Sequence, residues 1–236
     1  MQIAGLQKLT LIDYPDKLAC TIFLFGCNFR CGFCHNPELV FTNGQKGVYT
    51  EKNILDFLDK RKKYLDGVCI TGGEPLINPD LKDLLEKIKE KGFLIKVDTN
   101  GSNPGLLKEI IEQKLIDYVA MDIKTDANSY DILTGVDVDL SKIEESIKII
   151  FNSGINYGFR TTVIRGYHDP EKIKKIGKWI NNLVGKPKKY CIQNFIPREG
   201  KLIDEKFGKI IPFDDNELEE MKKAVSDYFE KIEIRN

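Results

Sequence analysis

The sequence contains little of several features that would assign a protein to a class at once. Its 236 residues include one tryptophan and two histidines, and 36 basic residues balance 36 acidic ones. The zero net charge gives no case for binding nucleic acid or an anionic membrane. No apolar run approaches the roughly 20 residues of a membrane span, and the first residues lack the basic start and apolar core of a signal peptide. We therefore expect a soluble protein of the reducing cytoplasm, with no membrane contact.

Internal repeats, low-complexity segments and linker-like stretches are also lacking. The length suits one large domain, and α/β barrels of this size are common. Apolar residues make up 42% of the chain, which supports a sizeable core, and the 31% of charged residues argue against disorder. We therefore expect a single domain over residues 1–236.

Half of the six cysteines lie close together, in the order C-x3-C-x2-C, as Cys27, Cys31 and Cys34. The apolar run 18–25 leads into them and Gly26 interrupts it, which predicts a strand that delivers a tight cysteine loop. Three thiolates in such a loop could surround one face of a small iron–sulfur cluster. Such clusters are usually held by four cysteines. Because no fourth cysteine is near in sequence, one iron could be left open for another ligand.

Other uses of three close cysteines fit this sequence less well. A structural zinc site needs a fourth ligand. His35 directly follows Cys34, which is poor geometry for two ligands of one ion, and His168 is far away in sequence. A disulfide framework suits short secreted chains. A non-catalytic metal-binding protein stays open at this point.

Short β-rich runs alternate with amphipathic helical runs along the chain, which indicates βα units and a parallel sheet. We predict strands at 18–25, 67–71, 93–98, 118–123, 156–164, 190–195 and 232–234. We predict helices that start near residue 50 and that cover about 81–91, 105–113, 141–151, 170–183 and 214–229. The cysteines outside the loop lie in these strands and are expected to be buried small apolar residues; they are Cys20, Cys69 and Cys191.

Polar motifs follow three of the predicted strands. They are Thr-Gly-Gly-Glu-Pro at 71–75, Asp-Thr-Asn-Gly at 98–101 and Asp-Ile-Lys at 122–124. Ligands gather at the carboxyl ends of strands in parallel α/β sheets and barrels, so the three motifs predict one ligand site. Each also has an ordinary interpretation: a strand-to-helix turn, a helix cap or Asx turn, and a surface ion pair.

Several charged side chains in and near these motifs suit a ligand with an amino-acid end. Asp98 could accept hydrogen bonds from an ammonium group or a ribose hydroxyl. Asp122 and Lys124 point to the same side of a strand and could clamp the two charged ends of an amino acid. Arg160 lies in an apolar strand and needs an anionic partner, because burial of a lone charge is costly. A ligand carboxylate and an inward salt bridge would both serve.

The cysteine segment resembles the signature of the radical S-adenosylmethionine (SAM) superfamily. In that family three cysteines bind a 4Fe–4S cluster, and the fourth iron binds the amino and carboxylate groups of SAM. The stretch 26–37, Gly-Cys-Asn-Phe-Arg-Cys-Gly-Phe-Cys-His-Asn-Pro, resembles more closely the activating enzymes of glycyl-radical enzymes. Residues 11–15, Leu-Ile-Asp-Tyr-Pro, are similar to the subgroup linked to anaerobic ribonucleotide reductase. The resemblance covers nearly the whole chain and is strongest before residue 125.

The resemblance implies the partial (β/α)6 TIM-like barrel of radical SAM enzymes, one 4Fe–4S cluster and SAM as cofactors. The cluster ligands that it implies are Cys27, Cys31 and Cys34. The SAM contacts that it implies are Phe33, Cys34, His35, Gly72, Gly73, Glu74, Asp98, Asp122, Ile123 and Lys124. A core role for Phe33, and a role of His35 in supporting the cluster loop, stay open.

The resemblance also implies an oxygen-sensitive reaction. One electron, from a donor such as flavodoxin or ferredoxin, would let the cluster cleave SAM to methionine and a 5′-deoxyadenosyl radical, which takes a hydrogen atom from a glycine of a partner enzyme.

The expected partner is anaerobic ribonucleotide reductase. Pyruvate formate-lyase activase has a SAM-contacting histidine near the sixth strand, where this chain has Gln193 and Asn194, so pyruvate formate-lyase is a weaker expectation. The alternative is a radical SAM enzyme acting on a small molecule in cofactor or modified-base synthesis. The basic segments 60–63 and 186–189 could receive an acidic electron donor.

Overall fold

The computed structural model describes residues 2–41, 47–198 and 200–236. These residues form two compact units. Unit one is built from the described parts of 1–28, 38–99 and 105–119, and unit two from those of 29–37, 100–104 and 120–236. The chain therefore crosses between the units five times, after residues 28, 37, 99, 104 and 119. The first crossing lies within the cysteine segment, and the last lies within a strand. The single domain expected over residues 1–236 stays a prediction.

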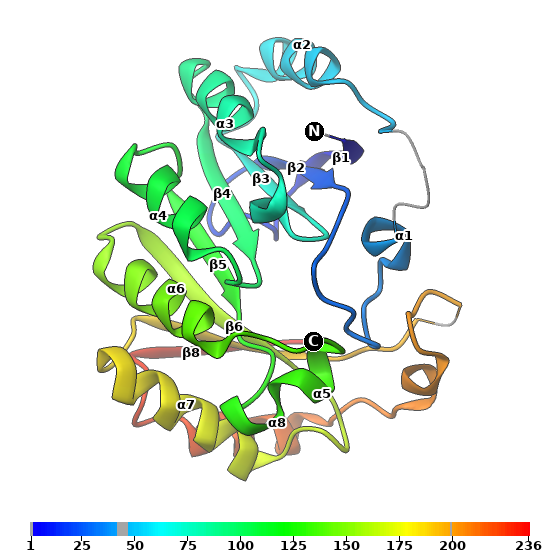
Figure 1. Ribbon diagram of the computed structural model, residues 1–236, viewed down its shortest axis with the longest axis vertical. Coiled ribbons are helices and arrows are strands. Elements are labelled where there is room, and N and C mark those ends of the chain that lie inside the picture. Colours follow the sequence, from blue (N-terminus) through cyan, green and yellow to red (C-terminus); the bar gives the residue numbers. More distant parts are fainter. Residues whose placement is uncertain (1, 42–46, 199) are drawn as a thin grey trace. The chain divides into compact units, whose positions relative to one another are not determined.

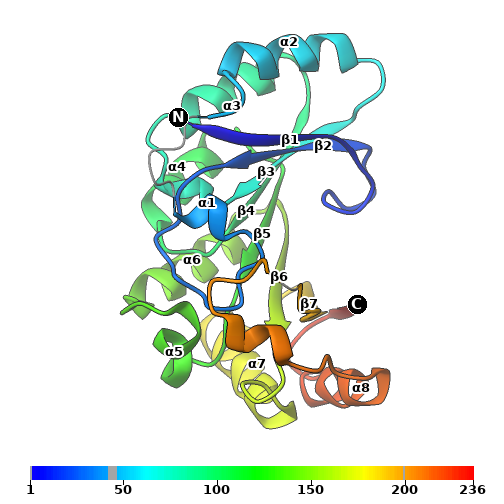
Figure 2. The same cartoon turned by 90° about the vertical axis from the view of Figure 1, so that its right-hand side faces the viewer.

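Unit one contains four strands that are hydrogen-bonded in chain order: β1 (Ile3–Thr10), β2 (Ala19–Leu24), β3 (Gly67–Gly72) and β4 (Leu94–Thr99). β1 runs antiparallel to β2, whereas β2, β3 and β4 are parallel. The helical segments are α1 (Pro37–Val40), α2 (Glu51–Arg61), η1 (Pro75–Ile77), α3 (Leu81–Glu90) and α4 (Pro104–Glu112). Figure 2 shows α2 and α3 on the same side of β1, β2 and β3.

The two faces of β2, β3 and β4 differ in character. The register aligns Cys20 with Val68, and Val68 with Ile95, and all three side chains are fully buried. This apolar face suits α3, which has buried leucines at helical spacing and contacts β4. The opposite face, set by the alternation of a strand, carries polar side chains: Thr21, Cys69, Thr71, Lys96 and Asp98.

Unit two continues the βα pattern. β5 (Tyr118–Asp122) begins in unit one and ends in unit two, and β6 (Asn156–Val163), β7 (Lys189–Asn194) and β8 (Lys231–Arg235) follow in parallel and in chain order. The helical segments are η2 (Ala127–Ser129), α5 (Tyr130–Thr134), α6 (Leu140–Asn152), α7 (Pro170–Val184), η3 (Glu205–Lys209) and α8 (Asp215–Ala224). α7 packs between α6 and α8 (Figure 1).

Most of the predicted elements are confirmed to within two residues. The sequence did not predict β1 or the short helices α1 and α5, and it placed the end of the last helix wrongly. β1 was not predicted, because register shifts on either side of residues 5–7 interrupt the alternation that marks a strand. The last helix was predicted to reach residue 229 but ends at Ala224. Val225 leaves the helical conformation (φ −112°, ψ 4°), and the buried Phe229, which continued the apolar spacing, lies beyond the turns at 225–228. Among the described residues, no helix combines the length and the apolar character needed to cross a membrane.

Candidate active site

Cys27 directly follows a backbone turn at the carboxyl end of the unit-one strands. Gly26 has a φ of +92°, which favours glycine. Its N–H donates to the carbonyl of Leu39 at 2.8 Å, and its own carbonyl accepts the N–H of Glu74 at 2.7 Å. A Cβ on Gly73 would overlap that carbonyl. The Gly-Gly-Glu motif after β3 therefore has a structural task, which is to support the entry to the cysteine segment.

The segment with the other two cysteines belongs to unit two. The N–H of Cys34 donates to the carbonyl of Cys31 at 3.0 Å and closes a turn. The carbonyl of Gly32 accepts the N–H of Asp204 at 2.9 Å. A Cβ on Gly32 would approach the ring of Phe207 to 2.6 Å, so only glycine allows this packing. The η3 region, far along the chain, thus holds the turn that presents Cys31 and Cys34.

The two aromatic side chains that flank Cys34 pack against the same residue. The ring of Phe33 is 7% exposed and lies edge-on to Phe195, with ring centroids 6.1 Å apart, and tilted against Phe207 at 6.0 Å. The ring of His35 stacks on Phe195 at 5.1 Å. Its Nε2 is buried and has no hydrogen-bond partner among the described residues. Burial, and next the charge of Arg198, lower the pKa of His35. The ring of Phe33 therefore has a core role, and His35 presents a neutral nitrogen that needs a partner.

Two of the polar motifs meet in unit one. One carboxylate oxygen of Glu74, which is 1% exposed, accepts the hydroxyl of Thr99 at 2.8 Å and the N–H of Leu76 at 3.0 Å. On the neighbouring position of β4, Asp98 accepts the hydroxyl of Thr71 at 3.3 Å. The structure thus brings the ends of β3 and β4 together, as the positions of the motifs at strand ends predict.

Sequence reasoning did not single out Lys96. Its side chain is 3% exposed, pairs with Asp98, and places its nitrogen 3.5 Å from the sulfur of Cys69. Cys69 was correctly predicted to be buried, but its surroundings are polar. A lysine within an apolar strand, two residues before an aspartate, is the signal that could have indicated this pair.

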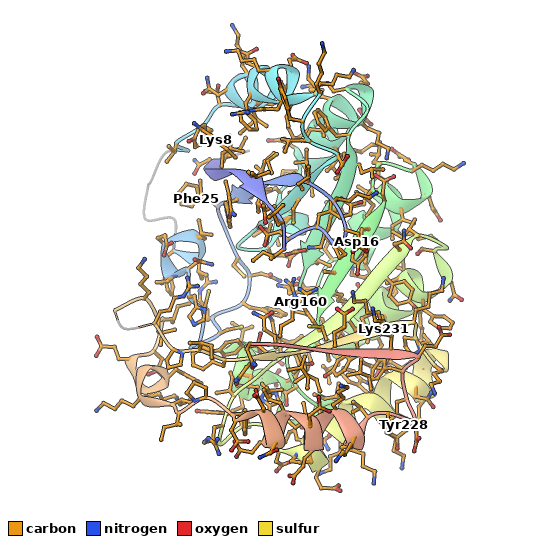
Figure 3. All side chains as sticks on the ribbon, turned by 180° about the vertical axis from the view of Figure 1, so that it is seen from behind. Lys8, Asp16, Phe25, Arg160, Tyr228 and Lys231 are labelled. Atoms are coloured by element: carbon orange, nitrogen blue, oxygen red, sulfur yellow. The ribbon has the colours of Figure 1, made fainter. Side chains whose placement is uncertain are left out.

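Three charged side chains meet in unit two. Asp122 pairs with Arg160, and its second carboxylate oxygen lies 2.9 Å from the side-chain nitrogen of Lys124. Arg160 lies on β6 and is labelled in Figure 3. Burial opposes the charge of Asp122, but the two cations outweigh it and lower the pKa of the carboxyl group. Burial likewise opposes the charge of Lys124, whereas Asp122 and then Cys31 raise its pKa. Asp122 and Lys124 do point to one side, and the trio carries one positive charge in excess.

Two further residues fix the end of β5. Ile123, which is fully buried, donates its N–H to the carbonyl of Arg160 at 2.8 Å, and its carbonyl accepts the hydroxyl of Thr161 at 2.7 Å. His168 is 4% exposed, and its Nε2 lies 3.1 Å from the carbonyl oxygen of Lys124. From the sequence, His168 was considered as a distant fourth ligand for a zinc site. The structure assigns it to the support of the Asp-Ile-Lys motif, beside a cavity of about 500 Å³.

The three loop cysteines are divided between the units: Cys27 lies in unit one, and Cys31 and Cys34 lie in unit two. Among the residues that the structure describes, no three side chains of His, Cys, Asp or Glu are arranged to hold one metal ion. The predicted cluster ligands and SAM contacts are therefore distributed over two units, each of which assembles its own part.

Comparison with known proteins identifies the family. The family model described as the Radical SAM superfamily matches residues 21–180, which is more than half of the chain. The chain belongs to the radical SAM superfamily. A protein of Methanocaldococcus jannaschii that is assigned by name to the glycyl-radical enzyme activating enzymes is 36% identical over 240 residues, which cover 99% of this chain and 95% of the relative. The pyruvate formate-lyase-activating enzyme of Clostridium pasteurianum is 32% identical over 189 residues and 77% of each chain.

A solved structure agrees on the fold. Streptococcus suis SuiB bound to S-adenosylmethionine superposes with a TM-score of 0.67 at 20% identity, over 91% of this radical SAM chain. This chain spans about half of SuiB, since the match covers 49% of that protein. The predicted fold class, an α/β fold with the partial barrel of radical SAM enzymes, is thereby confirmed.

Membership of the family identifies the cofactors of this radical SAM enzyme, which are a 4Fe–4S cluster and SAM. The residues present fit both groups. Thiols are the ligands that iron–sulfur clusters use. The buried Nε2 of His35, which has no partner among the described residues, is available for a hydrogen bond to a bound group, and the trio around Asp122 offers positive charge for a carboxylate.

Proposed function

We propose that this radical SAM enzyme activates an anaerobic ribonucleotide reductase by generating a glycyl radical on it. The relative from Methanocaldococcus jannaschii supports the class of activating enzyme, because its match covers 99% of this chain. The stretch 11–15 supports the finer choice of partner. In unit one this stretch is built into the fold: the carboxylate of Asp13 accepts the hydroxyl of Thr21 on β2 at 2.6 Å, and Tyr14 is 4% exposed.

The end of β7 supports the same choice. The two histidines of the chain are His35 and His168, so no histidine follows β7. Asn194 stands there instead, and its side chain forms hydrogen bonds with the backbone of Phe213 at 2.9 Å and 3.2 Å. This arrangement differs from the pyruvate formate-lyase activases, whose histidine in this region contacts SAM.

The roles that we propose for the cysteines and charged residues follow from their chemistry. Cys27, Cys31 and Cys34 are the residues that would hold the cluster. When bound, the cluster supplies the electron that splits the SAM sulfonium, and SAM supplies the radical that takes the glycine hydrogen. The trio of Asp122, Arg160 and Lys124 carries an excess positive charge and binds the SAM carboxylate. Asp98 accepts the SAM ammonium group.

The remaining residues that were predicted to contact SAM would do so mainly through backbone groups. Phe33 and Ile123 offer backbone groups, because the ring of Phe33 is in the core and the side chain of Ile123 is fully buried. His35 offers Nε2 to the bound nucleoside. Gly72, Gly73 and Glu74 hold the backbone that faces SAM at the end of β3. We place the protein in the cytoplasm, where flavodoxin or ferredoxin supplies the electron.

The test is electron paramagnetic resonance after anaerobic mixing of the reduced protein, SAM and a candidate partner. We expect a glycyl-radical signal on anaerobic ribonucleotide reductase and none on a reductase whose target glycine is replaced by alanine. A signal that forms only on pyruvate formate-lyase would overturn the choice of partner. Cleavage of SAM that depends on a small metabolite, with no radical on either protein, would favour the small-molecule alternative.

A further inference from the structure

A charged residue is buried within one strand of unit one. Lys96 lies on β4, is 3% exposed, and pairs with the carboxylate of Asp98 two residues further along. Its nitrogen lies 3.5 Å from the sulfur of Cys69 on β3. Thr71, also on β3, donates its hydroxyl to the second carboxylate oxygen of Asp98 at 3.3 Å. We call these four residues the Lys96 cluster.

The Lys96 cluster contains one cation and one anion. Along this polar face of β2, β3 and β4, all of which the structure describes, Lys96 and Asp98 are the charged residues. Next to it, Thr21 donates to Asp13 at 2.6 Å. Burial, then Asp117 and Cys69, raise the pKa of Tyr14, which therefore stays a neutral phenol. Lys96 thus supplies a full compensating charge in direct contact with Asp98.

Stability alone does not explain such a pair. Both ions lose much of their hydration here, since the side chains of Lys96 and Asp98 are 4% and 14% exposed, and two apolar side chains of similar size often serve such a place equally well. A carboxylate that loses its cation in such a place tends to take up a proton, because desolvation disfavours the charged form. The presence of Lys96 on β4 is explained if Asp98, at the carboxyl end of that strand, must stay ionised.

We propose that Lys96 is a positioning residue that keeps Asp98 ionised and oriented to accept the ammonium group of SAM. This inference rests on the proposed function, which places Asp98 at that ammonium group. A protonated Asp98 would form a neutral hydrogen bond in place of a charge-assisted one, and that difference corresponds to about tenfold in affinity. The competing hypothesis is that Lys96 neutralises Asp98 and competes with the SAM ammonium group for that carboxylate. In that case, removal of Lys96 would tighten the binding of SAM.

The test compares Lys96→Met with the wild-type protein, both with the cluster reconstituted to the same iron content. In infrared spectra recorded in D2O, we expect Lys96→Met to show a protonated-carboxyl band. That band should be absent from the wild type and from the double variant Lys96→Met/Asp98→Asn. The dissociation constant for SAM should rise about tenfold in Lys96→Met. Lys96→Arg, which keeps the positive charge, should restore both the spectrum and the affinity.

The control is Lys82→Met, which removes an exposed pair with Glu109 and should change neither readout. If Lys96→Met does not fold, Lys96→Gln carries the same two measurements. A variant without the new band, or with equal or tighter SAM binding, overturns the proposal. If the band appears but Asp98→Asn alone leaves SAM affinity unchanged, the effect of Lys96 on the charge stands, and the proposed placement of Asp98 at the SAM ammonium fails.

Discussion

The Nε2 atom of His168 lies 3.1 Å from the carbonyl oxygen of Lys124, so a ring in the loop after β6 holds the end of β5. The Nδ1 atom of the same ring accepts the N–H of Ile164 at 3.1 Å. Nδ1 must therefore be unprotonated, and Nε2 must carry the proton that it donates to Lys124. This arrangement requires a neutral imidazole. Burial, the largest cause, lowers the pKa of His168 from 6.5 to about 4.

We predict that His168 makes stability depend on pH. Between about pH 4 and pH 6.5 the unfolded chain binds a proton that the folded protein excludes, so the free energy of unfolding rises with pH in this window and falls as the solution is acidified. Relative to His168→Gln, the wild type should lose about 2 kcal/mol between pH 7 and pH 5. Denaturant titrations of both proteins at each pH measure this. Parallel curves over that range would contradict the prediction.

Replacement of any one of Cys27, Cys31 and Cys34 by alanine should abolish assembly of the cluster, because each removes a thiolate ligand. Cys20→Ala is the matched control: Cys20 is fully buried, and burial raises the pKa of its thiol to about 12. Iron and sulfide analysis after anaerobic reconstitution, together with the visible absorbance, measures the outcome. An intact cluster in Cys31→Ala would show that the ligand set is different.

Gly73→Ala should damage the entry to the cysteine segment, because its Cβ would overlap the carbonyl oxygen of Gly26. We expect a loss of about 2 kcal/mol or more in the free energy of unfolding, as for other overpacked sites, and a lower iron content. Gly208→Ala is the control, since the nearest atom to its Cβ would be 3.8 Å away, on Leu202. Equal stability and iron content in the two variants would mean that the backbone at Gly73 yields freely.

Lys124→Ala should weaken SAM binding at least about tenfold, the scale of one charge-assisted hydrogen bond. Lys188 is exposed, and Lys188→Ala should leave the affinity unchanged. Equilibrium dialysis of SAM against the reconstituted proteins gives both dissociation constants. If the two variants lose affinity equally, the loss does not come from the trio around Asp122, and the carboxylate of SAM binds elsewhere.

The parts of the site that could be predicted from the sequence are those whose signal is local. The spacing of the cysteines, the apolar run before them and the polar residues after β3, β4 and β5 all lie within a few positions of one another, and the structure places each at the predicted strand end. β1 could not be found in this way, because its irregular register hides the alternation of a strand. The roles of Asp204 and Phe207 were equally hidden, because they support Gly32 from a distant part of the chain.

By itself, the sequence determined the ligand chemistry and the order of the βα units, since thiol spacing and hydrophobic periodicity are properties of neighbouring residues. Only the tertiary structure decided which charges pair. Lys96 with Asp98 could have been suspected from their spacing, but Asp122 with Arg160, and His168 with the backbone of Lys124, join residues 38 and 44 positions apart. Parallel strands bring such residues together through crossovers of many residues, and which side chains then meet depends on register and packing that no local pattern records.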